Sequence, residues 1–358
     1  MVAAPDKFRG TATARQVAAV IGATAAEHGW TCDEAPLSDG GEGFCDVLGG
    51  RRRPLRVHGP LGDPVDAAWY QLDGGSTAVV EMALASGLAL VGGPAGNDPI
   101  GAGTAGTGEL IAAAVSDGAR RVLVGMGGSA TTDGGWGALK ALEPHGRLAG
   151  AELAVACDVT TRFVDAAATF SPQKGATPVQ VALLTRRLER LGGLYLERFG
   201  VDVRPLDGSG AAGGLAGGLA ALGATLGSGF DVVAERIDLA ARLEGADVVI
   251  TGEGLLDEES FHGKVVGGVA ALADEVGVPV VVIAGDTVLD DTVLDDTVLD
   301  DTVLDDTVAG GKALDGTVAG DTVPRHSLVA RFGRQRAFAD PLGCLSSVVA
   351  EVLAAYGG

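Results

Sequence analysis

The sequence is poor in aromatic and basic residues. Phe, Tyr and Trp make up 4% of the 358 residues, although 47% are hydrophobic, so Ala, Val and Leu must fill the core. Lys and Arg number 26 against 47 Asp and Glu, which gives a formal net charge of -21 at pH 7. This charge argues against nucleic acid or an anionic membrane surface as a partner.

Several sequence patterns are also missing. The four cysteines form no Cys-x-x-Cys pair, which argues against a zinc site or a disulfide framework and favours a reducing compartment. No apolar run reaches the roughly 18 residues that a membrane span needs, and the first residues do not resemble a signal peptide. We therefore expect a cytoplasmic protein. The Walker pattern Gly-x-x-x-x-Gly-Lys-Ser/Thr is absent, so this is not a P-loop enzyme.

Glycine, in contrast, is abundant, with 58 residues. The stretch 125–135 reads Gly-Met-Gly-Gly-Ser-Ala-Thr-Thr-Asp-Gly-Gly, between an apolar run at 121–125 and a helical pattern at 136–142. Open α/β sheets bind ligands at such strand–loop–helix junctions, where glycine amides and the helix N-terminus favour anions. The alternative is a tight turn with a serine cap. We predict phosphate binding by Gly127, Gly128, Ser129 and Thr131, and a magnesium ion on Asp133.

The hydrophobic pattern alternates between strands and helices. Strands are expected at 2–4, 32–37, 120–125, 153–157, 246–251 and 278–284, and helices at 11–28, 106–116, 178–199, 265–275 and 341–356. Three shorter runs at 55–58, 65–72 and 77–82 are expected to be antiparallel. A helix of small residues is expected to begin at 208–218. This alternation predicts the α/β class.

An acidic repeat interrupts the last third of the chain. Residues 286–308 repeat Asp-Thr-Val-Leu-Asp without any basic residue, and a degenerate continuation reaches Pro324. A calcium-binding tract would need glycine turns, and a solenoid would need more repeats. We expect a solvated low-complexity insert over 286–324.

Eight short blocks, in this order, resemble the bacterial glycerate kinases of the glyoxylate and galactarate pathway type. They are Ala-Pro-Asp-Lys-Phe-Arg-Gly at 4–10, Ser-Asp-Gly-Gly-Glu-Gly at 38–43, Gly-Thr-Gly-Glu-Leu at 106–110, 127–135, Ala-Cys-Asp at 156–158, Pro-Gln-Lys-Gly-Ala-Thr at 172–177, Gly-Ala-Ala-Gly-Gly at 210–214 and Thr-Gly-Glu-Gly at 251–254.

The resemblance implies a two-domain α/β fold and a specific reaction. A Rossmann-like domain with a flavodoxin-like parallel sheet is expected from 1–60 and 245–358, with a mixed α/β domain inserted at 61–244. The reaction implied is ATP- and Mg2+-dependent phosphorylation of D-glycerate, favouring 2-phosphoglycerate over 3-phosphoglycerate. We expect a monomer or homodimer.

Phosphoryl transfer needs cations, oriented carboxylates and a held acceptor. Lys174 and Lys264 are predicted to assist catalysis as cations, with Asp39 and Asp257 as catalytic carboxylates. Arg9 suits the carboxylate of glycerate, because a guanidinium binds carboxylate through two hydrogen bonds. The other substrate-binding candidates are Asp6, Lys7, Glu42 and Glu253. Asp158, at a strand end, fits either a capping or a functional role.

Two other functions remain open from the sequence. A substrate of few atoms leaves little trace, so the chain could phosphorylate another small hydroxy acid or polyol. It could also be a noncatalytic nucleotide-binding regulatory protein whose insert has disabled turnover.

Overall fold

The computed structural model describes residues 1–358 except 144–147, 149, 262–263, 290–322 and 357–358. Most of the expected low-complexity insert therefore lies outside the described residues. The chain forms two compact units: unit 1 is Met1–Leu37 with Ala234–Gly358, and unit 2 is Ser38–Val233. One unit is thus inserted in the sequence of the other, with boundaries at 37/38 and 233/234 instead of the expected 60/61 and 244/245.

Unit 1 contains a five-stranded parallel sheet. Its strands are β1 (Val2–Ala3), β2 (Asp33–Glu34), β9 (Val249–Thr251), β11 (Val280–Ala284) and β13 (Arg325–Ser327), in the spatial order β13-β11-β9-β1-β2. Numbered along the chain, this is the 2-1-3-4-5 order of flavodoxin-like folds. The predicted flavodoxin-like sheet is confirmed.

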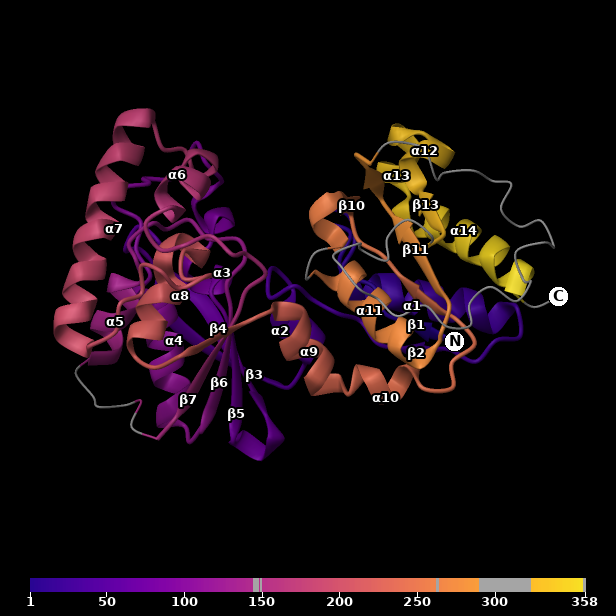
Figure 1. Ribbon diagram of the computed structural model, residues 1–358, viewed down its shortest axis with the longest axis horizontal. Helices are drawn as coiled ribbons and strands as arrows, with labels where there is room; N and C mark the ends of the chain where they lie inside the picture. The colour runs from indigo at the N-terminus through magenta and orange to yellow at the C-terminus, as the bar shows by residue number, and fades with distance from the viewer. Residues whose placement is uncertain (144–147, 149, 262–263, 290–322, 357–358) are drawn as a thin grey trace. The chain divides into compact units, whose positions relative to one another are not determined.

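Helices cover both faces of this sheet (Figure 1). Val281 and Ile283 of β11 pack in one core with α1 (Ala14–Glu27) and α14 (Pro341–Tyr356), whereas Val282 and Ala284 pack in a second core with α11 (Val265–Val276). The alternation follows from the two-residue period of a strand. Unit 1 also contains α10 (Leu239–Leu243), η5 (Glu258–Phe261), α12 (Leu328–Phe332), α13 (Arg334–Ala339) and the parallel pair β10 (Leu255–Leu256) and β12 (Asp286–Thr287).

Unit 2 contains a six-stranded mixed sheet. Its strands lie in sequence order: β3 (Arg51–His58), β4 (Pro64–Leu72), β5 (Thr77–Glu81), β6 (Arg121–Gly125), β7 (Glu152–Ala156) and β8 (Thr225–Gly227). β3, β4 and β5 are antiparallel, whereas β5 to β8 are parallel. The expectation that 77–82 forms an antiparallel strand is therefore correct for its pairing with β4 and wrong for its pairing with β6. β5 is antiparallel to β4 but parallel to β6, because a helical crossover links β5 to β6.

That crossover is α4 (Ala105–Ser116), which packs with α5 (Trp136–Leu142) over the sheet. The small-residue helix α8 (Ala211–Ala221) begins later than expected, since Ala212, Gly213 and Gly214 have left-handed backbone angles.

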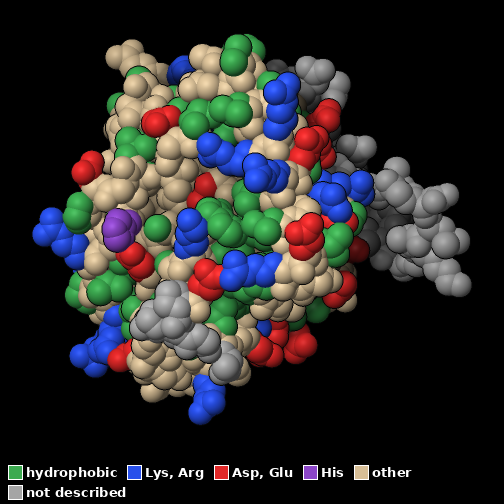
Figure 2. Space-filling model, turned by 90° about the vertical axis from the view of Figure 1, so that its left-hand side faces the viewer, with side chains coloured by type: hydrophobic (Ala, Val, Ile, Leu, Met, Phe, Trp, Pro, Cys, Tyr) green, Lys and Arg blue, Asp and Glu red, His purple; other side chains and the backbone are tan. Residues whose placement is uncertain are grey.

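The face that carries the long helix α7 (Pro178–Phe199) mixes basic, acidic and hydrophobic side chains (Figure 2). The remaining helices are α2 (Phe44–Leu48), η1 (Asp73–Gly75), α3 (Ala83–Ser86), η2 (Leu88–Val91), α6 (Ala166–Phe170) and η4 (Pro172–Lys174), with α9 (Gly229–Ile237) crossing the boundary between the units. Within the described residues, we find no helix with the length and hydropathy of a membrane span.

Candidate active site

The glycine-rich segment 125–135 links β6 to α5, as predicted. Gly127 is restricted to glycine, because a Cβ there would lie 2.3 Å from the Cα of Gly41. Gly128 has a φ of +72° and is exposed, whereas Ser129 and Thr131 are buried. The segment thus presents backbone, not side chains, at its outer turn. That arrangement suits an anion such as phosphate.

Asp133 organises the end of this segment. Its Oδ2 accepts hydrogen bonds from the amides of Thr104 and Gly137, each at 3.0 Å, and from the Thr104 hydroxyl at 2.9 Å. Its Oδ1 accepts one from the amide of Gly135 at 3.0 Å. A magnesium ion would have to displace some of these four donors. The arrangement therefore does not favour the metal role expected for Asp133, and it points to a structural role.

Lys174 is buried beneath the same segment. Its Nζ lies 2.6 Å from the carbonyl oxygen of Thr131 and 3.4 Å from Oγ of Ser129. Burial lowers the pKa of Lys174 to about 7, although the charge of Asp133 acts in the opposite direction. The side chain is only 4% exposed, so it holds the segment from the inside.

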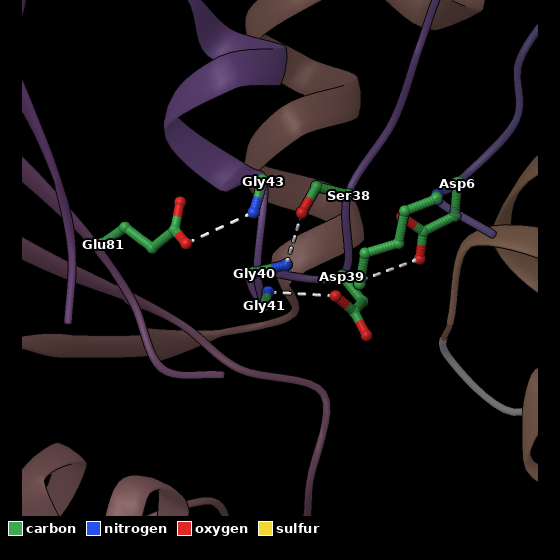
Figure 3. Close-up of polar contacts among 8 residues, drawn as sticks. Asp6, Ser38, Asp39, Gly40, Gly41, Gly43 and Glu81 are labelled. Atoms are coloured by element: carbon green, nitrogen blue, oxygen red, sulfur yellow. Dashed lines mark hydrogen bonds and ion pairs between the residues drawn. The ribbon is translucent and has the colours of Figure 1, made fainter. Parts of the chain in front are cut away.

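The segment 38–43 crosses the carboxyl ends of β5, β6 and β7. Figure 3 shows its internal contacts: Ser38 accepts from the amide of Gly40 at 3.3 Å and Asp39 from that of Gly41 at 2.9 Å. Buried Glu81, the last residue of β5, accepts from the Gly43 amide at 3.3 Å. These contacts fix Asp39 at the strand ends. Glu42 is exposed.

Asp158 lies just after β7 and close enough to Asp39 for their charges to interact. Its Oδ1 accepts from the amide of Gly229 at 2.7 Å, whereas its Oδ2 is buried without a partner among the described residues. Burial, and then the charge of Asp39, raises the pKa of Asp158 to about 7. We made no assignment for Asp158 from the sequence. The signal was its place at the carboxyl end of a parallel strand.

The carboxylate oxygens of Asp39 and Asp158 are of the type that magnesium prefers as ligands. The described residues contain no group of three or more His, Cys, Asp or Glu side chains that could hold a metal alone. Magnesium usually takes only one or two carboxylates, and substrate phosphates and water complete its shell. The orphaned Oδ2 of Asp158 therefore fits a site that is completed by a ligand.

In unit 1, the candidates after β1 lie at the topological switch point between β1 and β9. The amide of Asp6 donates to the carbonyl of Gly252 at 2.8 Å, which joins the ends of the two strands. Asp6 is buried and forms an ion pair with Lys7 at 3.5 Å, whereas Arg9 is exposed. Glu253 directly follows Gly252. Doubly wound sheets bind ligands at this position.

Asp257 and Lys264 lie further along unit 1. Oδ1 of Asp257 accepts from the amide and the hydroxyl of Ser260, each at 3.0 Å, and lies 3.8 Å from Nζ of Lys264. Asp257 thus caps the short helix η5, and Lys264 stands at the N-terminus of α11. The expected residues therefore form separate groups in each unit. Unit 2 holds 39, 42, 127–133 and 174, and unit 1 holds 6–9, 253, 257 and 264.

Comparison with known proteins identifies the family. The model of the glycerate kinase family matches residues 1–145 and 143–305. The chain belongs to the glycerate kinase family. It is 38% identical to a glycerate kinase of Bacillus subtilis, covering 81% of this chain and 86% of the relative, and 37% identical to a glycerate 2-kinase of Escherichia coli, with the same coverage. The predictions of the family and of a kinase-type enzyme are confirmed.

A solved structure supports the same assignment. The crystal structure of a putative glycerate kinase 2 from Salmonella typhimurium LT2 is 32% identical and has a TM-score of 0.75. The match covers 99% of this chain and 96% of that one. The two-domain α/β architecture of this member of the glycerate kinase family is thus found in a solved relative.

Proposed function

We propose that this protein phosphorylates D-glycerate at its 2-hydroxyl, with ATP as the phosphoryl donor and Mg2+ as the required ion. The observation that carries the proposal is the glycine–hydroxyl segment 127–131 at the carboxyl end of β6, whose outer turn offers backbone amides to an anion. Family membership supports glycerate as acceptor. The 2-hydroxyl is preferred because the Escherichia coli relative is named a glycerate 2-kinase.

The nucleotide phosphates are assigned to the amides of Gly128, Ser129 and Thr132, because the amide of Gly127 donates to the carbonyl of Gly40 at 3.3 Å. Thr131 is proposed to stabilise the segment from the interior, since it is fully buried and its hydroxyl lies 3.0 Å from that of Ser129. Backbone donors of this kind cost no reorganisation when charge develops on the transferred group.

Magnesium is assigned to Asp39 and Asp158 in place of Asp133. When bound, the ion would neutralise charge on the phosphate oxygens. Asp39 is held by the Gly41 amide and Asp158 by the Gly229 amide, so each carboxylate has one oxygen engaged by the backbone. Burial, and then the charge of Asp39, raises the pKa of Asp158, and a bound divalent ion would offset both effects.

The acceptor is assigned to the switch point of unit 1. Arg9 is proposed to bind the carboxylate of glycerate through two hydrogen bonds, with Asp6, Lys7 and Glu253 around the hydroxyls. Glu42 stays a further candidate. Lys264 is proposed as the cation near the transferred phosphoryl group, with Asp257 orienting its ammonium.

A coupled assay of ADP release with D-glycerate, ATP and Mg2+, followed by phosphorus NMR of the product, tests the proposal. We expect 2-phosphoglycerate, and little turnover with L-glycerate, lactate or glycerol. Arg9→Leu should raise KM for glycerate roughly 10- to 100-fold while nucleotide affinity is unchanged, because a hydrogen bond to a charged group contributes about 1.5–3 kcal/mol. Turnover with another hydroxy acid alone, or ATP binding without any turnover, would contradict the acceptor assignment.

A further inference from the structure

Three residues of the glycine-rich segment, Gly128, Ala130 and Thr131, accept hydrogen bonds from other parts of unit 2 through their carbonyl oxygens. The carbonyl of Gly128 accepts from the amide of Leu88 at 2.8 Å, and that of Ala130 accepts from Nδ2 of Asn97 at 3.0 Å. The carbonyl of Thr131 accepts from Nζ of Lys174 at 2.6 Å. All of these contacts lie within unit 2.

Asn97 connects the glycine-rich segment at residue 130 to the backbone at residue 174. Its Nδ2 also donates to the carbonyl of Lys174 at 2.9 Å, so a single amide group bridges residues 130 and 174. The turn at Gly175 is close-packed, since a Cβ there would lie 2.5 Å from the carbonyl oxygen of Pro94. The segments around 97, 130 and 174 are therefore fixed relative to one another.

Fixed carbonyls also fix the direction of the amides. A trans peptide is planar, and its C=O and N–H groups point to opposite sides. Because the carbonyls of Gly128 and Thr131 are held from the inside, the amides of Ser129 and Thr132 point the other way. Within the described part of the chain, neither of these two amides has a backbone acceptor. The Thr132 hydroxyl likewise has no partner there.

We propose that Asn97 and Lys174 are positioning residues that form a clamp, and that the clamp holds the amides of the glycine-rich segment in the orientation that binds the nucleotide phosphates. This inference rests on the proposed function. It changes the role of Lys174 from the catalytic contact expected from the sequence to one exerted through the Thr131 carbonyl. Asn97 carried no signal in the sequence.

Loss of the clamp should weaken binding of the nucleotide phosphates, because the backbone amides that bind them would lose their orientation. Without an ammonium at the Thr131 carbonyl, the peptide can rotate and present its oxygen to the phosphate, where it repels instead of donating. An ammonium on the carbonyl also polarises the peptide, which strengthens its N–H as a donor. In enzymes, misplacement of reacting groups by about 1 Å can lower the rate about 100-fold, and we expect a loss of similar size for misplaced phosphate donors.

Equilibrium binding of ADP to the full chain, measured by calorimetry without glycerate, tests the clamp. We expect Lys174→Met and Asn97→Ala each to weaken ADP binding roughly 10- to 100-fold. The double variant should be little worse than the more damaged single variant, because both act through one clamp. KM for glycerate should stay near the wild-type value. The matched control is Lys140→Met, which removes an exposed lysine of α5 and should leave ADP binding unchanged.

The outcomes separate this inference from the proposed function. Wild-type protein that binds no nucleotide would overturn both. Normal ADP affinity in folded Lys174→Met, with turnover alone reduced, would overturn the clamp and restore a direct catalytic contact. Additive losses in the double variant would also overturn it. If Lys174→Met does not fold, Asn97→Ala carries the test, since Asn97 is only half-buried.

Discussion

In unit 2, Asp133 and Glu81 are buried and accept hydrogen bonds from backbone amides, whereas in unit 1 Asp257 and Lys264 are partly exposed and pair with each other. Asp133 and Glu81 are 9% and 4% exposed, and each accepts hydrogen bonds from several backbone amides. In unit 1, Lys264 and Asp257 keep 24% and 33% of their side chains exposed and lie 3.8 Å apart. The candidate residues of the two units thus include two kinds of polar structure.

The difference indicates two ways of building a polar site. Backbone donors held by buried carboxylates keep one geometry, which suits phosphates that are the same in every nucleotide. Exposed side chains adapt more easily, which suits recognition of a small acceptor. Energetically, a buried network loses much when one acceptor is removed, whereas exposed ion pairs contribute only about 0–1 kcal/mol. The comparison can therefore be tested by single substitutions.

The largest effect is expected from Asp133→Ala. It leaves four donors without their acceptor in the interior of unit 2, and we expect a loss of about 3–5 kcal/mol in the free energy of unfolding. Urea titration followed by circular dichroism measures it. Asp257→Ala in unit 1 is the control and should cost about 1 kcal/mol. Equal losses in the two variants would break the comparison.

Gly127→Ala should have the next largest effect. Its Cβ would lie 2.3 Å from the Cα of Gly41, so the two segments must separate, at a cost of about 1–3 kcal/mol. ADP affinity should fall with stability, because the clash lies in the proposed phosphate site. Gly193→Ala in α7 is the control: nothing lies within 4 Å of the added Cβ, and helix propensity should make it neutral or slightly stabilising. A stable Gly127→Ala protein would show that these segments are not closely packed.

The raised pKa of Asp158 leads us to expect that the free energy of unfolding depends on pH, with a smaller effect than the two substitutions above. Its pKa is raised to about 7 in the folded protein, against about 4 for an unfolded aspartate. Between these values the folded state binds more protons than the unfolded state, so the free energy of unfolding should fall as pH rises from about 4 to about 7. The contribution is on the order of 1 kcal/mol after allowance for solvent screening.

Thermal unfolding of metal-free protein across this pH range measures the effect. Asp158→Asn should remove this part of the slope and raise stability at pH 8, while magnesium should stabilise the wild type more than the variant. A slope that is unchanged in Asp158→Asn would show that the carboxyl ionises normally. No difference in magnesium response would contradict the metal assignment.

Local patterns predicted much of the fold and the local structure of the glycine-rich segment. The apolar runs at 121–125 and 280–284 and the glycines at 127 and 128 are local signals, and the structure places them in a strand–loop–helix unit and a flavodoxin-like sheet. The domain boundaries were harder to predict from the sequence. Nothing near residue 51 shows that β3 pairs with β4 along its full length, and this pairing places residues 51–58 in unit 2.

The partners of buried polar groups could not be predicted, because they come from distant parts of the chain. The sequence predicts a metal ligand at Asp133, and it gives no sign that Thr104, 29 positions earlier, supplies two of the hydrogen-bond donors to this carboxylate. Lys174 resembled a catalytic cation, yet its ammonium lies 2.6 Å from a carbonyl 43 positions earlier. Residue type shows that such a group needs a partner when buried, but only tertiary packing decides which partner it finds.

The smallest effect on stability is expected from Lys264→Met in unit 1. The ion pair with Asp257 is long and partly exposed, so its loss should change the free energy of unfolding by less than about 1 kcal/mol. Turnover should nevertheless fall strongly if Lys264 assists transfer of the phosphoryl group, since the charge of a bound phosphate would be met by one cation fewer. Urea titration and the ADP-release assay on the same preparation separate the two effects. A stability loss as large as that of Asp133→Ala would show that Lys264 and Asp257 are held as tightly as Asp133, and the division between rigid and adaptable polar groups would fail.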